Sequence, residues 1–283
     1  MENIMREMTI NTYANCVAEA IGETATATPV EKANGVVLYG ITIRNDTNIR
    51  PTIYVEDWYK RDVPVEQAAK EIMEIAEKKR IENFNISTIN EWEEVKPMLQ
   101  ARLYNKATKA EIFRKATGFD DLIIIPYINL GNIGGGQGSI KVTEKMCELW
   151  GVTKRTVIDT AVKNTRGKII IEDLEEMLVQ MMVEQGMPEE MARMMSVNDG
   201  PKMFVISNRD KCFGAIQAIL GREKLKKSFP NGYTIIPSSV HEVLLIPDAN
   251  MDEEYLRGMI GEVNTQEVLP EEVLGTKPYI FAA

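Results

Sequence analysis

Apolar and polar residues alternate along this chain with two different periods, which predict a mixture of helices and strands. Between Val65 and Ala76 the apolar residues recur every three or four positions, and Pro64 stands just before them, which is typical of an amphipathic helix. The same spacing predicts further helices over 2–20, 143–150, 153–164, 174–181 and 256–263.

Short apolar runs rich in β-branched residues predict the strands. The runs 36–43 and 52–55 flank turn-forming residues and predict a hairpin. The run 122–128 predicts a buried strand, in which Pro126 indicates an edge position or a bulge. Further strands are predicted over 98–104, 203–206, 213–220, 233–236 and 240–246, and residues 25–29 are expected to be a connection.

The predicted elements do not alternate strictly as strand, helix, strand. We therefore predict an α+β fold, with a mixed, largely antiparallel sheet and amphipathic helices packed on it. A chain of 283 residues can form one large domain or two ordinary ones. We predict a single α+β unit over 1–283, which could divide into subdomains 1–105 and 106–283 because residues 105–118 are polar.

Composition and charge exclude several classes of protein. The chain has 42 acidic and 33 basic residues and a net charge of −9, which weighs against nucleic-acid binding by the whole surface. No apolar run is long enough to span a membrane, and the N-terminus lacks the apolar core of a signal peptide. The three cysteines lie far apart in sequence, which fits a reducing compartment. We expect a cytoplasmic protein without membrane contact.

A glycine-rich stretch, 129–139, raises the question of a phosphate-binding loop. A P-loop needs Lys and then Ser or Thr after its last glycine, whereas Gln137 and Gly138 follow Gly136 here. A dinucleotide-binding fingerprint would need glycine at Ser139, and a strand rather than a helix is predicted there. We therefore predict a mobile hairpin loop between two strands, and no bound cofactor.

The segment 143–164 resembles a helix-turn-helix. Cys147, Gly151 and Val157 occupy the small, turn and apolar positions of that motif. The residues that would face the major groove of DNA are Lys154, Arg155 and Thr156. The acidic total charge and the flanking strands favour an ordinary helix pair instead, so we expect no nucleic-acid partner. Its apolar positions are predicted to pack on the sheet: Met146, Leu149, Val157 and Ala161.

The only histidine, His241, lies between Ser239 and Glu242, and these three residues are the candidate catalytic residues. On a strand, Ser239 and His241 would share one face while Glu242 would point to the other, which weakens a local triad. We therefore expect a structural His241, hydrogen-bonded to Ser239. Without a second histidine or a pair of neighbouring cysteines, no metal site is predicted.

Methionine is concentrated in one segment, because eight of the sixteen methionines lie between Met177 and Met203. Surfaces rich in methionine adapt to varied partners, so we predict that a protein partner binds through this segment. The alternative places Met177 and Met181 in the core and treats the rest as a flexible insert around Pro188, with residues 186–199 mobile.

Three short segments stand in one order along the chain: Trp-Gly-Val-Thr at 150–153, Pro-Ser-Ser-Val-His-Glu-Val at 237–243 and Pro-Glu-Glu-Val-Leu at 270–274. With them the chain resembles an uncharacterised domain-of-unknown-function family of gut Firmicutes bacteria. The resemblance implies a bacterial cytoplasmic protein and supplies no activity, cofactor or catalytic residue. In that family an acidic stretch often follows Trp-Gly-Val-Thr, which also weighs against DNA binding.

We therefore predict a non-enzymatic intracellular binding or accessory protein. The first alternative is a DNA-binding regulator that uses the segment 143–164. The second is a hydrolase-like enzyme around Ser239 and His241.

Overall fold

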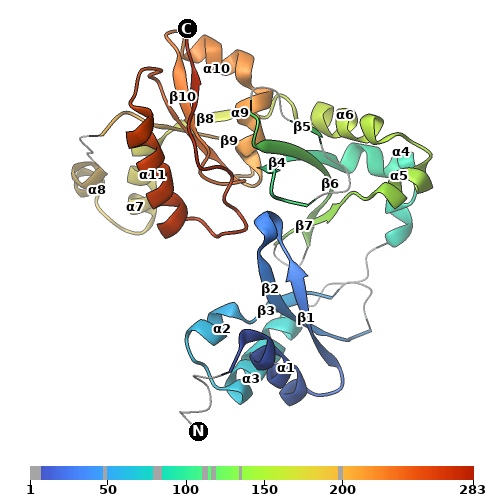
Figure 1. Ribbon diagram of the computed structural model, residues 1–283. Helices are drawn as coiled ribbons and strands as arrows, with labels where there is room; N and C mark the ends of the chain where they lie inside the picture. The colour runs from blue at the N-terminus through green and yellow to red at the C-terminus, as the bar shows by residue number, and fades with distance from the viewer. Residues whose placement is uncertain are drawn as a thin grey trace.

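The computed structural model describes residues 8–46, 50–78, 85–109, 114–115, 119–133, 136–196 and 200–283. In this part of the chain, helices pack around three antiparallel sheets, so the predicted α+β class is confirmed. Figure 1 shows the N-terminal sheet at the bottom, a second sheet in the middle and a third that leads to the C-terminus at the top.

The N-terminal part folds around an apolar core of its own, to which Tyr13, Ile41 and Ile72 contribute fully buried side chains. Helix α1 begins where the Thr9 side chain accepts a hydrogen bond from the Thr12 backbone N–H, as an N-cap does. The elements are α1 (Ile10–Ile21), β1 (Ala25–Glu31), η2 (Ala33–Gly35), β2 (Val37–Ile43), β3 (Thr52–Tyr54), α2 (Glu56–Lys60) and α3 (Val65–Lys78).

The hairpin of β2 and β3 and the helix after Pro64 are confirmed. The connection predicted at 25–29 is wrong, because these residues belong to β1, which pairs with β2 along its whole length. The strand consists largely of small residues and contains Pro29, so its sequence lacks the apolar alternation that predicts a strand. The sheet order is β1–β2–β3, so Pro29 lies on an edge strand, where a missing N–H is tolerated.

In the second sheet, β6 is an interior strand, with β4 on one side and β5 and β7 on the other. The edge position predicted from Pro126 is therefore wrong. The pairing with β5 ends at Ile124 and the pairing with β7 begins at Tyr127, so Pro126 falls between the two partners. The strands are β4 (Leu99–Asn105), β5 (Arg114–Lys115), β6 (Leu122–Ile133) and β7 (Gly136–Lys141).

Helices cover the second sheet, and α6 lies against β4, where the Thr165 hydroxyl accepts a hydrogen bond from the Ala101 backbone N–H (2.9 Å). The turn between α5 and α6 is at Gly151, whose φ of +65° favours glycine. The two predicted helices broken at Gly151 are thus confirmed. The elements are η3 (Ile86–Ile89), α4 (Trp92–Val95), η4 (Lys96–Met98), α5 (Glu144–Trp150) and α6 (Lys154–Thr165).

The third sheet has the order β12–β10–β11–β9–β8, with every neighbouring pair antiparallel. Helix α11 covers one face through Leu256 and Ile260, which pack against Ile236 and Ile246. The elements are β8 (Ile170–Asp173), α7 (Leu174–Glu184), α8 (Glu189–Ser196), β9 (Phe204–Ser207), η5 (Gly214–Ile216), α9 (Gln217–Leu220), α10 (Arg222–Ser228), β10 (Tyr233–Ile236), β11 (Val243–Ile246), α11 (Glu253–Gln266) and β12 (Tyr279–Phe281).

Two strand predictions in this sheet need correction. The predicted strand 213–220 is helical, because it forms η5 and α9. Four successive residues, 215–218, are buried there, and an apolar run buried on all sides carries no readable period. The strand predicted from Val240 begins only at Val243, because the Ser239 hydroxyl accepts hydrogen bonds from the backbone N–H groups of His241 and Glu242 and turns the chain.

The fully buried apolar residues form two large cores, one within 13–72 and one within 95–279. Strand β4 belongs to the second core. The division of the chain into subdomains 1–105 and 106–283 stays a prediction. Asn34 connects the two parts, since its Nδ2 donates to the carbonyls of Pro270 (2.9 Å) and Val273 (2.8 Å). Among the described residues, no helix combines the length and apolarity needed to cross a membrane.

Candidate functional site

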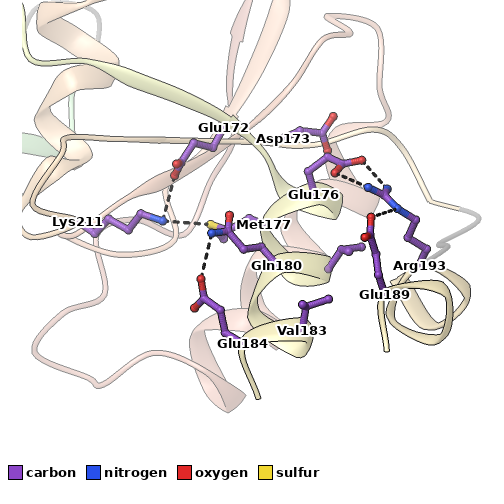
Figure 2. Close-up of a pocket in the computed structure, with 11 residues that line it drawn as sticks. Glu172, Asp173, Glu176, Met177, Gln180, Val183, Glu184, Glu189, Arg193 and Lys211 are labelled. Atoms are coloured by element: carbon purple, nitrogen blue, oxygen red, sulfur yellow. Dashed lines mark hydrogen bonds and ion pairs between the residues drawn. The ribbon is translucent and has the colours of Figure 1, made fainter. Parts of the chain in front are cut away.

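Helices α7 and α8 form a hairpin beside strand β8 and line a groove of about 590 Å³ (Figure 2). The Asp173 carboxylate caps α7 by accepting a hydrogen bond from the Glu175 backbone N–H (3.0 Å). Gly186 makes the turn between the helices with φ +94°, and Pro188 stands just before α8, which suits a helix start. Local sequence therefore sets where each helix begins.

One wall of the groove is held by Arg193 of α8. Its Nη1 donates to Oε1 of Glu176 on α7 (2.9 Å), and its Nε donates to Oε1 of Glu189 one turn earlier on α8 (3.1 Å). The hydrogen bond from Arg193 lowers the pKa of Glu176, and the same bond raises the pKa of Arg193. These ion pairs are solvent-exposed, so they orient α8 on α7 more than they stabilise the fold.

The opposite wall is held by Lys211, whereas Lys202, which does not line the groove, pairs with the lining residue Asp173. Lys211 Nζ lies 3.2 Å from Oε2 of Glu172 and 3.9 Å from Sδ of Met177, as Figure 2 shows. Lys202 Nζ lies 2.8 Å from Oδ2 of Asp173, and the hydrogen bond between them lowers the pKa of that carboxyl. The groove thus has charged walls around an apolar floor that includes Met177.

Most large apolar side chains of the two helices are exposed to solvent. Met194 is 79% exposed, whereas Val179 and Ala192 lie buried beneath the hairpin. The exposed apolar side chains on these helices are Leu178, Met181, Val183, Met191, Met194 and Met195. We call these six residues together with the groove the methionine surface. These side chains therefore do not contribute to a core of the described chain.

The structure bears on the alternative interpretation of this segment. Met181, which that alternative places in the core, is 48% exposed. Residues 189–196, which it treats as part of a flexible insert, form the helix α8, whose buried face consists of Ala192 and Ser196. Whether residues 186–199 are mobile stays a prediction, and residues 197–199 lie outside the described residues.

The candidate DNA-binding residues lie at the start of α6. Lys154 bonds to Glu144 of α5, and Arg155 Nε lies 3.5 Å from Oδ2 of Asp159. The Thr156 backbone N–H donates to the Thr153 hydroxyl that caps the helix. Both candidate cations are therefore matched by carboxylates of their own helix pair.

The apolar side of α5 and α6 was expected to pack on the sheet. Val157 and Ala161 are fully buried and Met146 packs against the same core, but Leu149 is 61% exposed, so its predicted burial is wrong. DNA binding by Lys154 and Arg155 stays a prediction.

His241 lies in the turn before β11, with both ring nitrogens engaged. Nδ1 accepts a hydrogen bond from the Phe213 backbone N–H (3.2 Å), and Nε2 lies 3.2 Å from Oε1 of Glu272. Because Nδ1 is an acceptor, the ring proton is on Nε2 and is donated to Glu272. The Ser239 hydroxyl accepts hydrogen bonds from the backbone N–H groups of His241 and Glu242. The expected hydrogen bond between Ser239 and the His241 ring therefore does not form.

Glu272 is 31 positions from His241 and has no local sequence signal that could have revealed this pairing. Glu272 is an acidic partner for the His241 ring, but the Ser239 hydroxyl is hydrogen-bonded to backbone N–H groups. Neither ring nitrogen is left to accept a proton from Ser239. The catalytic assignment of Ser239, His241 and Glu242 stays a prediction.

No group of three His, Cys, Asp or Glu side chains that could hold a metal ion occurs in the described part of the chain. Cys16, Cys147 and Cys212 are free, and burial raises the pKa of the Cys147 and Cys212 thiols. The glycine-rich stretch continues the β6–β7 hairpin as far as the pair Ile133↔Gly136, and residues 134–135 at its tip lie outside the described residues.

Sequence comparisons place the whole described fold in one family. No curated protein and no solved structure matches the chain. One family model matches residues 7–283. The chain therefore belongs to the family of unknown function DUF5688.

Proposed function

We propose that this protein is a non-enzymatic binding protein, and that its methionine surface docks a basic amphipathic helix of a protein partner. The observation that carries the proposal is the exposure of Met181, Met191, Met194 and Met195 on α7 and α8, the two helices that line a groove of about 590 Å³. Exposed apolar side chains gain free energy when a partner removes them from water. An unbranched thioether adapts to the side chains of varied partners.

The charge of the methionine surface selects the chemistry of the partner. The groove is lined by five acidic side chains and two basic ones, Arg193 and Lys211, whereas acids only modestly exceed bases in the whole chain. Acids concentrated around an apolar floor attract a segment that combines apolar and basic residues. A helix with one apolar and one basic face presents both kinds of side chain at once, which is the helix-in-groove mode of recognition.

Three free cysteines support the cytoplasmic location that we include in this proposal. In a reducing compartment the exposed methionines and the thiols keep their apolar, unoxidised forms. The partner would then be another cytoplasmic protein.

A binding titration tests the proposal with a defined probe. The probe is a fluorescent helical peptide of about four turns, built from Leu on one face and Lys on the other. A matched peptide with Glu in place of Lys serves as the control for charge. We expect the Lys peptide to bind, and we expect added salt to weaken its binding because the acidic residues are exposed.

A protein variant tests whether the peptide binds to the methionine surface rather than elsewhere on the molecule. The triple substitution Met191→Ser, Met194→Ser and Met195→Ser should raise Kd for the Lys peptide at least about tenfold, or about 1.4 kcal/mol. Met73→Ser is the matched control, because Met73 is 51% exposed on α3, far along the chain. Equal affinity of the triple variant and wild type, or equal binding of the two peptides, would overturn the proposal.

The methionine surface could instead be covered by a second copy of this chain. Sedimentation without peptide then shows a dimer that the triple variant loses, and this result would replace the proposed partner by self-association.

A further inference from the structure

Arg102 on β4 is a buried cation without a counter-ion among the described residues. It is 2% exposed, and its Nη1 donates to the Ser139 hydroxyl (3.0 Å). Its Nε and Nη2 are fully buried and have no hydrogen-bond partner. No ion pair joins Arg102 to a carboxylate of the described chain. A guanidinium does not lose its proton in a protein, so this charge stays uncompensated.

The two unpaired nitrogens lie on one edge of the guanidinium. Nε–H and one N–H of Nη2 point the same way, and their spacing matches two oxygens of a carboxylate or a phosphate. This edge is the one that forms bidentate hydrogen bonds with anions. The structure therefore satisfies the remaining nitrogen through Ser139 and leaves the anion-binding edge without a partner.

Aromatic rings hold the guanidinium in place. Its carbon lies 3.5 Å from the ring centre of Phe213 and 4.4 Å from that of Tyr127. Tyr104 stacks against Tyr127 with 6.0 Å between ring centres. Ring faces attract the cation, but they cannot accept the in-plane N–H groups as an oxyanion does. The rings thus orient Arg102 without satisfying its edge.

The segment 208–213 covers this cluster. Phe213 is half-buried and has φ +50°, and Lys211 before it has φ +47°. The Asn208 side chain holds the turn by donating to the Cys212 carbonyl (2.9 Å), and His241 Nδ1 holds the Phe213 backbone N–H. Residues 209–211 are exposed, and the Phe213 ring is the part of this segment that lies over the guanidinium of Arg102.

We propose that Arg102 is the anchor of a binding site for a small oxyanion ligand of the carboxylate or phosphate class. The ligand presents two oxygens to Nε and Nη2, and it enters when the Phe213 side chain moves aside. Ser139 and Tyr127 border the site. This site is independent of the methionine surface.

Thermal unfolding of the full chain tests the site with sodium phosphate and sodium acetate as probes. Sodium chloride keeps the ionic strength constant. In wild type, we expect one or both anions to raise Tm by about 2–4 °C at ten times Kd, since a ligand that binds only the folded state stabilises it. Comparison of the two anions tells which oxyanion the site prefers.

Arg102→Met is the decisive variant, because methionine has a similar volume and no charge. We expect its Tm without added anion to equal or exceed that of wild type, and its response to either anion to disappear. Arg155→Met is the matched control, since the Arg155 side chain is 90% exposed and its loss should leave the response intact.

Three results would overturn the site: no response of wild type to either anion, the same response in Arg102→Met, or a large fall in Tm of Arg102→Met without anion. The last result would make Arg102 a structural cation held by Ser139 and the rings. If Arg102→Met does not fold, the Nε–H resonance of Arg102 in wild type, identified through its contacts with the Phe213 ring, gives the answer. Its shift in the presence of anion supports the site, and an unchanged resonance refutes it.

Discussion

The helix pairs α5–α6 and α7–α8 are built by the same local rules but use their apolar faces differently. Thr143 and Thr153 cap the first pair, Asp173 caps α7, and both pairs turn at a glycine with positive φ. Helix α6 buries its apolar face on the sheet. On α7 and α8 only small parts of the surface are buried, and the methionines remain exposed.

This difference is the basis of our proposal that α7–α8, rather than α5–α6, binds a partner. On α5–α6, Lys154 and Arg155 face carboxylates of the same pair. On α7–α8, Arg193 also faces carboxylates of its own pair, but there the charged side chains frame an apolar groove (Figure 2). Hydrophobic periodicity is present in both pairs, so periodicity alone does not reveal which pair leaves its large apolar side chains exposed.

The largest expected effect is the difference in unfolding free energy between one substitution in α6 and one in α8. Ile158→Ala in α6 should cost about 2–4 kcal/mol of unfolding free energy, because it leaves a cavity in the core. Met194→Ala in α8 should change the free energy of unfolding by less than about 0.5 kcal/mol, because Met194 is exposed. Urea unfolding followed by circular dichroism measures both. Equal losses would show that α8 is as much a part of the core as α6.

The turn of the structural pair gives the next effect. Gly151→Ala should cost about 1–2 kcal/mol, because an L-residue is strained at φ +65° while the space around the added Cβ is open. Gly258→Ala in α11 is the control, since this glycine also has open space but no positive φ. Alanine favours a helix, so the control should be neutral or slightly stabilising in the same urea experiment. A Gly151→Ala variant as stable as wild type would contradict the strain argument.

Acid should loosen α7–α8 before α5–α6. The pKa values of Asp173 and Glu176 are lowered from 3.8 and 4.5 in the folded protein, by hydrogen bonds from Lys202 and Arg193. Their contribution to stability is therefore complete above those values and is lost as the pH falls through the lowered ones. The hydrogen-exchange protection factors of α7–α8, which correct for the intrinsic pH dependence of exchange, should fall below about pH 4, while α6 stays protected by burial.

Arg193→Gln is the control for this pH effect, because it removes the partner of Glu176. It should make the exchange of α8 faster already at neutral pH and reduce the further change in acid. Uniform loss of protection across both helix pairs would mean that exchange follows global unfolding instead.

The smallest effect belongs to the surface charges of α6. Reversing Lys154 and Arg155 to Glu should change stability by less than about 1 kcal/mol, because both side chains are exposed. Wild type should not bind duplex DNA below micromolar concentration. Tight binding that weakens steeply with salt and disappears in the reversed variant would restore the helix-turn-helix hypothesis.

Local patterns predicted most helices and strands because their period is readable in the chain itself. The helix 65–78, the helix pair around Gly151 and the hairpin of β2 and β3 follow from spacing and turn residues. Residues 213–220 were misassigned because burial on all sides removes the period. Strand β1 was missed because its pairing with β2, rather than its composition, makes it a strand.

The candidate sites depended on contacts that no local pattern encodes. The methionine-rich composition pointed to α7 and α8, but the pairing of Arg193 with Glu176 joins residues 17 positions apart. The pairing of His241 with Glu272 spans 31 positions, and it replaces the expected bond to Ser239. In the sequence, Arg102 is only one polar residue within a predicted strand. The structure shows that its guanidinium lies between the rings of Phe213 and Tyr127.

By itself, the sequence determined the α+β class, the helix starts and turns, and the acidic, methionine-rich character of one segment. These properties depend on the spacing of neighbouring residues and on composition. Only the tertiary structure decided which apolar faces are buried, where Pro126 stands in its sheet and which charges lack partners. Burial and pairing depend on residues far apart in the chain, so their consequences for binding appear only when the elements have packed.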